Sequence, residues 1–135
     1  MLITVDVVVL CNGGVVLIRR KKPPFMDRLV LPGGHVEDSD VSLAVACCRE
    51  LVEEIGLKVV PEQLKLLTVL DAKDRDPRPE RRVSIVFMVK LTERPLLTAG
   101  SDALKVEVVE LDSITQVMIG FDHYQAIMAA KGEAS

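Results

Sequence analysis

The rest of this chain is expected to be arranged around residues Pro32–Leu57, PGGHVEDSDVSLAVACCRELVEEIGL. This stretch joins a glycine turn to a segment with the apolar spacing of an amphipathic helix. At about 100° per residue, Glu50, Glu53 and Glu54 fall within one arc of roughly 100° on that helix. The buried side is therefore expected on the opposite arc, which consists of Ala44, Val45, Cys48, Leu51, Val52 and Ile55.

The three glutamates indicate a metal site. Carboxylates at positions i, i+3 and i+4 of a helix repel one another by roughly 0.2–0.5 kcal/mol per pair. A divalent cation would turn that repulsion into binding, since Mg²⁺ prefers hard oxygen ligands. The neighbouring glycines let the backbone approach such an ion and offer it a carbonyl oxygen. A solvated helix face is the alternative interpretation, because Glu is a common helix former.

Gly34 followed by Arg49–Leu57, RELVEEIGL, resembles the Nudix box, whose pattern is G-x5-E-x7-R-E-U-x-E-E-x-G-U with U aliphatic. The second half of the pattern matches at every specified position. Arg49 lies fifteen positions after Gly34, where the family has fourteen, so the first half contains one inserted residue. The family's first Glu therefore falls on Asp40 or Val41, and Asp40 is one methylene shorter than Glu.

Other segments resemble the ADP-ribose pyrophosphatase branch of the Nudix family. Residues Leu17–Pro24, LIRRKKPP, look like the segment that precedes the box in that branch. Residues Arg75–Arg78 match its RDPR loop, and Asp102, Ala103 and Phe121–His123 match two further features. Together these segments touch nearly the whole chain in the right order.

The resemblance implies a metal-dependent hydrolase that cleaves the diphosphate bond of ADP-ribose into AMP and ribose 5-phosphate. Its implied cofactor is Mg²⁺, with Mn²⁺ as an alternative. The implied catalytic residues are Arg49, Glu50, Glu53 and Glu54. The implied metal ligands are Gly34, Glu50, Glu53 and Glu54.

Three arginines are expected to bind the substrate, because a guanidinium group pairs bidentately with phosphate oxygens. They are Arg19, in the basic segment before the glycine turn, and Arg75 and Arg78, in the RDPR loop. The general base stays open among Glu53 on the helix and Asp76 or Glu80 on the loop.

Length and composition favour one globular domain over residues 1–135, with 49% hydrophobic residues and a net charge of −3. We expect no membrane span, since no apolar run approaches eighteen residues, and no signal peptide. The three cysteines form no C-x-x-C pattern and indicate reduced thiols, hence a cytoplasmic protein. The negative charge argues against a nucleic-acid partner and favours a small-molecule nucleotide.

Hydrophobic periodicity and turn signals predict one mixed α/β (α+β) domain. The resemblance implies a Nudix-like mixed β-sheet sandwiched between helices. Strands are predicted over Leu2–Leu10, Val15–Arg20, Arg28–Leu31, Leu64–Ala72, Arg82–Leu91 and Leu104–Leu111. Helices are predicted from Ser42 to Gly56 and from a capping box at Asp122 to about Ala130, before Gly132.

Two other functions remain open. One is a nucleoside triphosphate or oxidised-nucleotide pyrophosphohydrolase, against which the RDPR loop argues. The other is a module that binds ADP-ribose without cleaving it, against which the complete second half of the box argues. A homodimer is a further alternative, for which Val86 and Met88 on the outer face of their strand would suit an interface.

Overall fold

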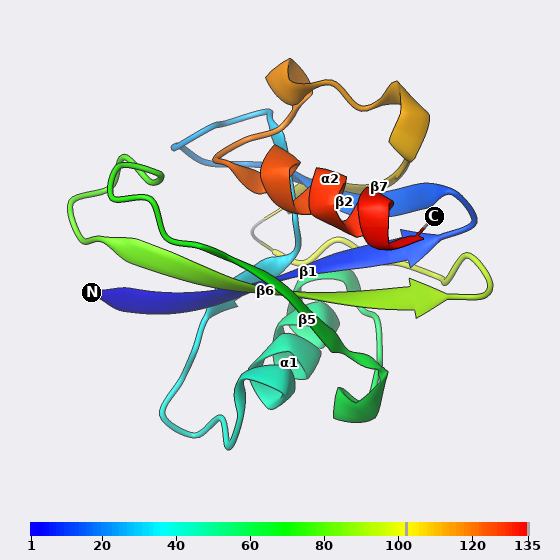
Figure 1. The fold of residues 1–135 in the computed structure, drawn as a ribbon, viewed down its shortest axis with the longest axis horizontal. Helices are drawn as coiled ribbons and strands as arrows, with labels where there is room; N and C mark the ends of the chain where they lie inside the picture. Colours follow the sequence, from blue (N-terminus) through cyan, green and yellow to red (C-terminus); the bar gives the residue numbers. More distant parts are fainter. Residues whose placement is uncertain (102, 135) are drawn as a thin grey trace.

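The computed structural model describes residues 1–101 and 103–134. Asp102, which matches a feature of the ADP-ribose pyrophosphatase branch, lies outside the described residues. Within them the chain forms a mixed sheet with α1 (Leu43–Ile55) on one face and α2 (His123–Ala134) on the other (Figure 1). The expected α/β fold, a mixed sheet between helices, is confirmed.

The sheet contains seven strands in the order β3-β2-β1-β6-β5, with β4 also paired to β1 and β7 to β2. The strands are β1 (Leu2–Cys11), β2 (Gly14–Arg20), β3 (Leu29–Val30), β4 (Gly33–His35), β5 (Lys65–Leu70), β6 (Arg82–Leu91) and β7 (Ala103–Glu110). Short 3₁₀ helices cover Pro61–Gln63, Leu111–Ser113 and Gln116–Met118.

The first strand changes partner along its length, and this change positions the glycine turn. At the hairpin end, β1 pairs with β2 only at Leu10↔Val15 and Cys11↔Gly14. Its first half pairs instead with β4, in the register from Thr4↔His35 to Asp6↔Gly33. The strands can approach this closely because a Cβ at Gly33 would overlap the backbone of β1.

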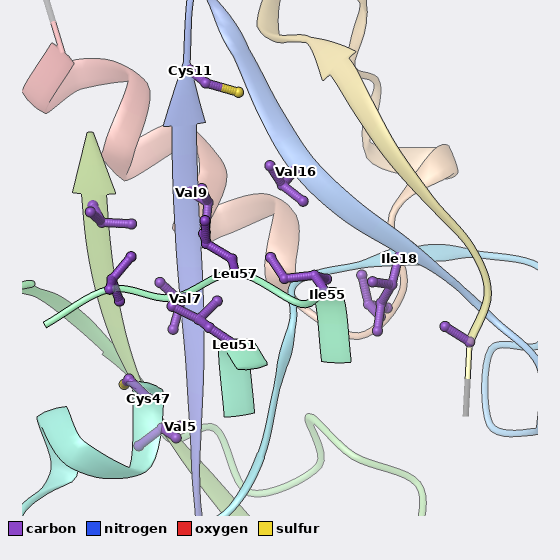
Figure 2. Packing of buried hydrophobic residues seen from close by; sticks show 14 of the residues in the cluster. Val5, Val7, Val9, Cys11, Val16, Ile18, Cys47, Leu51, Ile55 and Leu57 are labelled. Atoms are coloured by element: carbon purple, nitrogen blue, oxygen red, sulfur yellow. The ribbon is translucent and has the colours of Figure 1, made fainter. Parts of the chain in front are cut away.

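The sheet has a hydrophobic core on each face. Val5, Val7 and Val9 of β1 belong to the core on the side of α1, where Figure 2 shows Val7 near Leu51 and Val5 near Cys47. The alternate residues of β1, including Val8 and Leu10, are buried on the side of α2. β1 is therefore buried on both faces, as its run of β-branched residues predicts.

The ends of α1 are where the sequence predicts them. Ser42 is the N-cap and accepts a hydrogen bond from the Val45 backbone, and Gly56 ends the helix at φ 68°. The predicted buried arc is confirmed at Leu51 and Ile55 and is wrong at Val52. Val52 is 53% exposed, while the buried residues are Ala46, Cys47, Glu50, Leu51 and Ile55. The small side chains of Ala46 and Cys47 let this side of the helix approach the sheet, and Glu50 is buried with them.

Strand β6 alternates as predicted, but its second face is closed. Val89 packs in the core beside α1, whereas Val86 and Met88 are 0% and 2% exposed in the core beside α2. The expectation that Val86 and Met88 would offer a dimer interface is therefore wrong, because α2 covers them.

The last helix is longer than its glycine suggests. Gly132 lies inside α2, which continues to Ala134 rather than ending near Ala130. Glycine lowers helix propensity but does not by itself end a helix. No helix within residues 1–101 and 103–134 is long and apolar enough to cross a membrane.

Candidate active site

The glycine turn and the glutamate helix meet at Gly34 and Glu50. A Cβ at Gly34 would overlap the Glu50 carboxylate, so only glycine allows this approach. Glu50 is 7% exposed. Burial raises the pKa of its carboxyl above the ordinary value, and the Arg49 guanidinium opposes that rise. A buried carboxylate beside a backbone turn is an arrangement that a cation would stabilise.

The three box glutamates open on one pocket of about 580 Å³, here called the acidic pocket. Glu50 is buried at its base, Glu53 is exposed at its rim, and Glu54 also lines the neighbouring pocket. The acidic pocket is lined by Gly34, His35, Glu37, Glu50, Glu53, Glu54 and Ser101.

The donors of the acidic pocket suit a hard divalent cation. They are carboxylates and a backbone turn that a side chain would block, and Mg²⁺, Mn²⁺ and Ca²⁺ prefer such oxygen ligands. Within residues 1–101 and 103–134, no three acidic, histidine or cysteine side chains have already converged as a ligand set. Arg49 is ion-paired with both Glu50 and Glu53, so a cation shared by these two carboxylates would compete with its guanidinium group.

Arg49 ties the acidic residues together. Its NH1 donates to Glu50 Oε1 at 2.7 Å and to Glu53 Oε2 at 3.3 Å, and its NH2 donates to the His35 carbonyl at 3.0 Å. Its Nε and NH2 donate to the two Asp40 oxygens at 3.0 and 2.9 Å. The pKa of Arg49 is raised, first by its hydrogen bonds to Asp40, so the guanidinium stays charged. Arg49 is thus ion-paired with both Glu50 and Glu53.

The inserted residue leaves Asp40 behind Arg49. The Asp40 carboxylate also accepts a hydrogen bond from the Glu37 backbone at 2.8 Å, and its hydrogen bonds to Arg49 lower its pKa. Val41, the other candidate for the family's first Glu, is 87% exposed. Neither residue lines the acidic pocket. Asp40 therefore supports the pocket through Arg49.

A second pocket of about 400 Å³, here called the cationic pocket, adjoins the acidic one and shares Gly34, His35 and Glu54 with it. Five cationic side chains line it, against three acidic ones. The cations are Arg20, Lys22, Arg75, Arg78 and Arg82, and the acids are Asp6, Glu54 and Asp76. Part of the negative charge is already paired with cations of the protein, as Asp76 is with Arg78. Positive charge therefore prevails, and the pocket suits an anionic group.

The two arginines of the RDPR loop have different surroundings. Arg75, whose side chain is 4% exposed, donates three hydrogen bonds of 2.7–3.1 Å to the carboxylate of Asp122 beside α2. Arg78 is 35% exposed and donates to Asp76 within the loop. Arg75 therefore anchors the loop to Asp122 at the start of α2, and Arg78 remains available at the pocket. The Asp122 carboxylate, expected as a helix cap, is the partner of Arg75.

In the basic segment, Arg20 rather than Arg19 lines the cationic pocket. Arg19 points to the neighbouring strand, where its Nε donates to Glu107 at 3.1 Å, and its NH1 donates to the Asp27 carbonyl. Arg20 Nε donates to the Pro24 carbonyl at 2.6 Å. Successive side chains of a strand alternate between its faces, so the structure places the cation one residue beyond the predicted one.

A buried polar network closes the inner wall of the cationic pocket. Asp6 accepts a hydrogen bond from Ser84 and lies 3.5 Å from His123 Nε2. His123 Nδ1 in turn accepts a hydrogen bond from the Leu31 backbone at 3.1 Å. Burial acts to raise the pKa of Asp6, but His123 and Ser84 outweigh it, and the net pKa is lowered. Asp6 is therefore satisfied by its neighbours, and His123 ties the start of α2 to the Leu31 backbone.

Comparisons with known proteins identify the family of the chain. The family model for the NUDIX domain matches residues 2–129. The chain belongs to the NUDIX domain family. An ADP-ribose pyrophosphatase of Methanocaldococcus jannaschii is 36% identical to this Nudix chain over 125 residues, which are 93% of this chain and 70% of that protein.

Two solved structures share the Nudix fold. A bifunctional NMN adenylyltransferase/ADP ribose pyrophosphatase from Francisella tularensis, complexed with AMP and a Mn ion, is 31% identical with a TM-score of 0.83. That match covers 99% of this chain and 42% of the Francisella chain. The NUDIX domain of Shewanella oneidensis NrtR, complexed with ADP ribose, is 26% identical with a TM-score of 0.88. That match covers 89% of the Shewanella chain. The present chain thus spans less than half of the Francisella protein.

The structure separates the candidate bases of this Nudix domain. Glu80 lies 3.5 Å from the N-terminal ammonium group of Met1 and outside both pockets. Asp76 is buried, and although burial acts to raise its pKa, the bonds from Arg78 lower it. Glu53 is exposed at the rim of the acidic pocket. Among the three, only Glu53 lines the acidic pocket.

Sequence reasoning missed several residues of the cationic pocket. Arg20 and Arg82 both lie on strands, where alternation from a known buried neighbour could have found them. Phe121, next to a histidine at the start of α2, also lines the pocket. It packs against Phe25 with ring centroids 4.7 Å apart, an approach between distant segments that no local pattern predicts.

Proposed function

We propose that this Nudix domain hydrolyses the diphosphate bond of ADP-ribose, yielding AMP and ribose 5-phosphate. The observation that carries the proposal is the pair of adjoining pockets of opposite charge, which share Gly34, His35 and Glu54. A diphosphate carries two anionic groups joined by one oxygen. An acidic pocket that holds a cation and a cationic pocket beside it suit such a ligand, one group to each side.

Glu50, Glu53, Glu54 and the Gly34 carbonyl would hold Mg²⁺, or Mn²⁺ in its place. When bound, such an ion acidifies a water molecule and neutralises charge on the phosphate oxygens. Arg49 gives the glutamates their fixed positions, because it donates to Glu50 and Glu53 at once. Gly34 keeps the floor of the pocket open, since any side chain there would meet Glu50.

The reaction adds one water across the diphosphate. The water oxygen bonds to one phosphorus, the bond from that phosphorus to the bridging oxygen breaks, and the bridging oxygen stays with the other product as part of its phosphate. A base must take the proton of the water. Of the residues in reach, Glu53 borders the metal-binding side and is our candidate. Arg78, at the mouth of the cationic pocket, supplies positive charge for the phosphate oxygens.

The test is a substrate panel. ADP-ribose, other nucleoside diphosphate sugars and deoxynucleoside triphosphates are incubated with the protein and Mg²⁺, and the products are resolved by chromatography. We expect AMP and ribose 5-phosphate from ADP-ribose at the highest kcat/KM. Faster cleavage of triphosphates would assign the domain to the nucleotide pyrophosphohydrolases instead. Tight binding of ADP-ribose with no product, in the presence of Mg²⁺ or Mn²⁺, would make it a binding module.

The setting of the reaction follows from the thiols and the charge. We propose a cytoplasmic protein, because Cys11, Cys47 and Cys48 are free and are kept reduced there. Its proposed partner is the small nucleotide rather than a nucleic acid, since the net charge is −3 and the cations line a pocket.

A further inference from the structure

Phe121 carries two guanidinium groups on its ring. The Arg20 Cζ lies 5.2 Å and the Arg78 Cζ 5.6 Å from the ring centroid. A cation within about 6 Å of an aromatic face is attracted by the ring quadrupole. Both arginines and Phe121 line the cationic pocket. Residues about forty to a hundred positions apart along the chain are thus brought together at one ring.

The backbone and neighbouring rings hold Phe121 in this position. Its φ is 52°, in the left-handed region that aromatic residues rarely adopt. The ring packs against Phe25 at 4.7 Å and against the His123 imidazole at 5.3 Å. Strained backbone of this kind persists where the surroundings determine it and is frequent at functional sites.

The two arginines repel each other. Burial lowers the pKa of Arg20, and the nearby charge of Arg78 lowers it further. Asp76 compensates Arg78 by accepting hydrogen bonds from its Nε and NH2, while Arg20 donates to the Pro24 carbonyl, a neutral acceptor. The charges of Asp76 and Glu54 offset only part of the effect on Arg20, whose net pKa is lowered. Two like charges held side by side are a cost to the fold that an anion between them would offset.

A third arginine in the same pocket has an unused donor. Arg82 begins β6, and its NH1 donates to the Glu80 carbonyl at 2.8 Å. Its Nε is fully buried with no hydrogen-bond partner, and it is the one such side-chain atom among residues 1–101 and 103–134. A buried donor left unpaired costs about 1–3 kcal/mol, and a ligand oxygen would remove that cost.

We propose that Arg20, Arg78 and Arg82, with Phe121 as the positioning residue for the first two, form an anion receptor that binds one phosphate group of a diphosphate without a metal. This inference rests on the proposed function, in which the other phosphate group lies at the acidic pocket. The receptor accounts for the unused Arg82 donor and for the paired guanidinium groups. It also makes Phe121 a determinant of substrate affinity although it carries no charge.

The experiment measures the binding of inorganic pyrophosphate by calorimetry, with the full chain in buffer containing EDTA. The wild-type protein should bind saturably, and more weakly as salt is added. Arg20→Gln and Arg82→Gln should each weaken binding about tenfold or more. Phe121→Leu should weaken it about tenfold and Phe121→Tyr less than about threefold, because tyrosine keeps the aromatic face. Arg19→Gln, which changes the adjacent arginine outside the pocket, is the matched control and should bind as the wild type does.

Circular dichroism and thermal melting check that each variant is folded. With Mg²⁺ and ADP-ribose, Phe121→Leu should raise KM and leave kcat nearly unchanged, a pattern that general loosening of the fold would not produce. The receptor is wrong if pyrophosphate does not bind without metal, or if folded Arg82→Gln and Phe121→Leu bind as tightly as the wild type. Arginine-dependent binding of pyrophosphate with no ADP-ribose cleavage would keep the receptor and overturn the proposed function.

Discussion

Replacing Arg75 by Ala should destabilise the fold, although Arg75 belongs to the motif predicted to bind substrate. The side chain is 4% exposed and donates three hydrogen bonds to Asp122, whose side chain is 15% exposed. Removing one partner of a buried ion pair costs about 3–5 kcal/mol, because the other charge is left unpaired. Water can reach part of Asp122, so we expect about 2–4 kcal/mol. For a domain of this size that loss corresponds to a fall in Tm of roughly 10 °C.

The assay is urea unfolding followed by circular dichroism, with Arg78→Ala as the matched variant from the same loop. Arg78 is 35% exposed but its partner Asp76 is 3% exposed, so Arg78→Ala leaves a buried carboxylate without its cation and should cost about 1–3 kcal/mol. Its removal should also lower kcat/KM for ADP-ribose by about tenfold or more, because a guanidinium group of the cationic pocket is lost. Arg75→Ala should thus lower stability more than Arg78→Ala, and folded Arg78→Ala should lose more of kcat/KM.

A double-mutant cycle completes the test. Arg75→Ala and Asp122→Asn should be non-additive by about 1 kcal/mol or more, since each removes the same contact. Additive effects, or a loss below about 0.5 kcal/mol for Arg75→Ala alone, would refute the anchoring role.

The acidic pocket and the cysteines give three further predictions. Glu54→Gln should lower kcat by about a hundredfold or more without loss of thermal stability in EDTA, since it removes one repelling carboxylate; wild-type rates at saturating Mg²⁺ would rule out the metal role. Asp40→Ala should cost about tenfold or less, because it acts through Arg49, and a loss equal to that of Glu54→Gln would instead identify a direct ligand. Burial raises the pKa of Cys47 from 9.0 to about 12, so iodoacetamide at pH 8 should modify it only after unfolding. Rapid labelling of the native protein would contradict the burial of this thiol. Because the fold favours the neutral thiol, the free energy of unfolding should fall as the pH rises from 9.0 toward 12.

Local signals predicted the local structure well. Ser42 and Gly56 bound α1 as expected, because capping depends on residues within one turn of the helix end. The hairpin between β1 and β2 turns at Asn12-Gly13 with positive φ at both residues, a conformation that the Asn-Gly pair favours. The three glutamates were found together because a helix brings positions i, i+3 and i+4 onto one side.

Contacts between distant segments could not be predicted in this way. The partner of Arg75 is 47 positions away, and its choice of Asp122 over a phosphate depends on how the loop meets α2. The burial of Glu50 depends on how closely α1 approaches β4, which the small residues of α1 allow. The sequence indicated Arg19 rather than Arg20 at the pocket, because it does not show which face of β2 turns toward the pocket. The pairing of β2 with β7 fixes that face.

The parallel pairing of β1 with β6 has a consequence for how the protein is made. Leu2 pairs with Arg82, eighty residues later, and the two strands stay in register to Cys11 and Leu91. Closing so long a loop is slow compared with forming a hairpin or a helix. Asp6 comes from the first of these strands and Arg82 from the second, so the cationic pocket cannot form before both have joined. During synthesis on the ribosome, the edge of β1 that pairs with β6 therefore stays unpaired until β6 has emerged. Nucleotide binding should then be among the last properties that the new chain acquires.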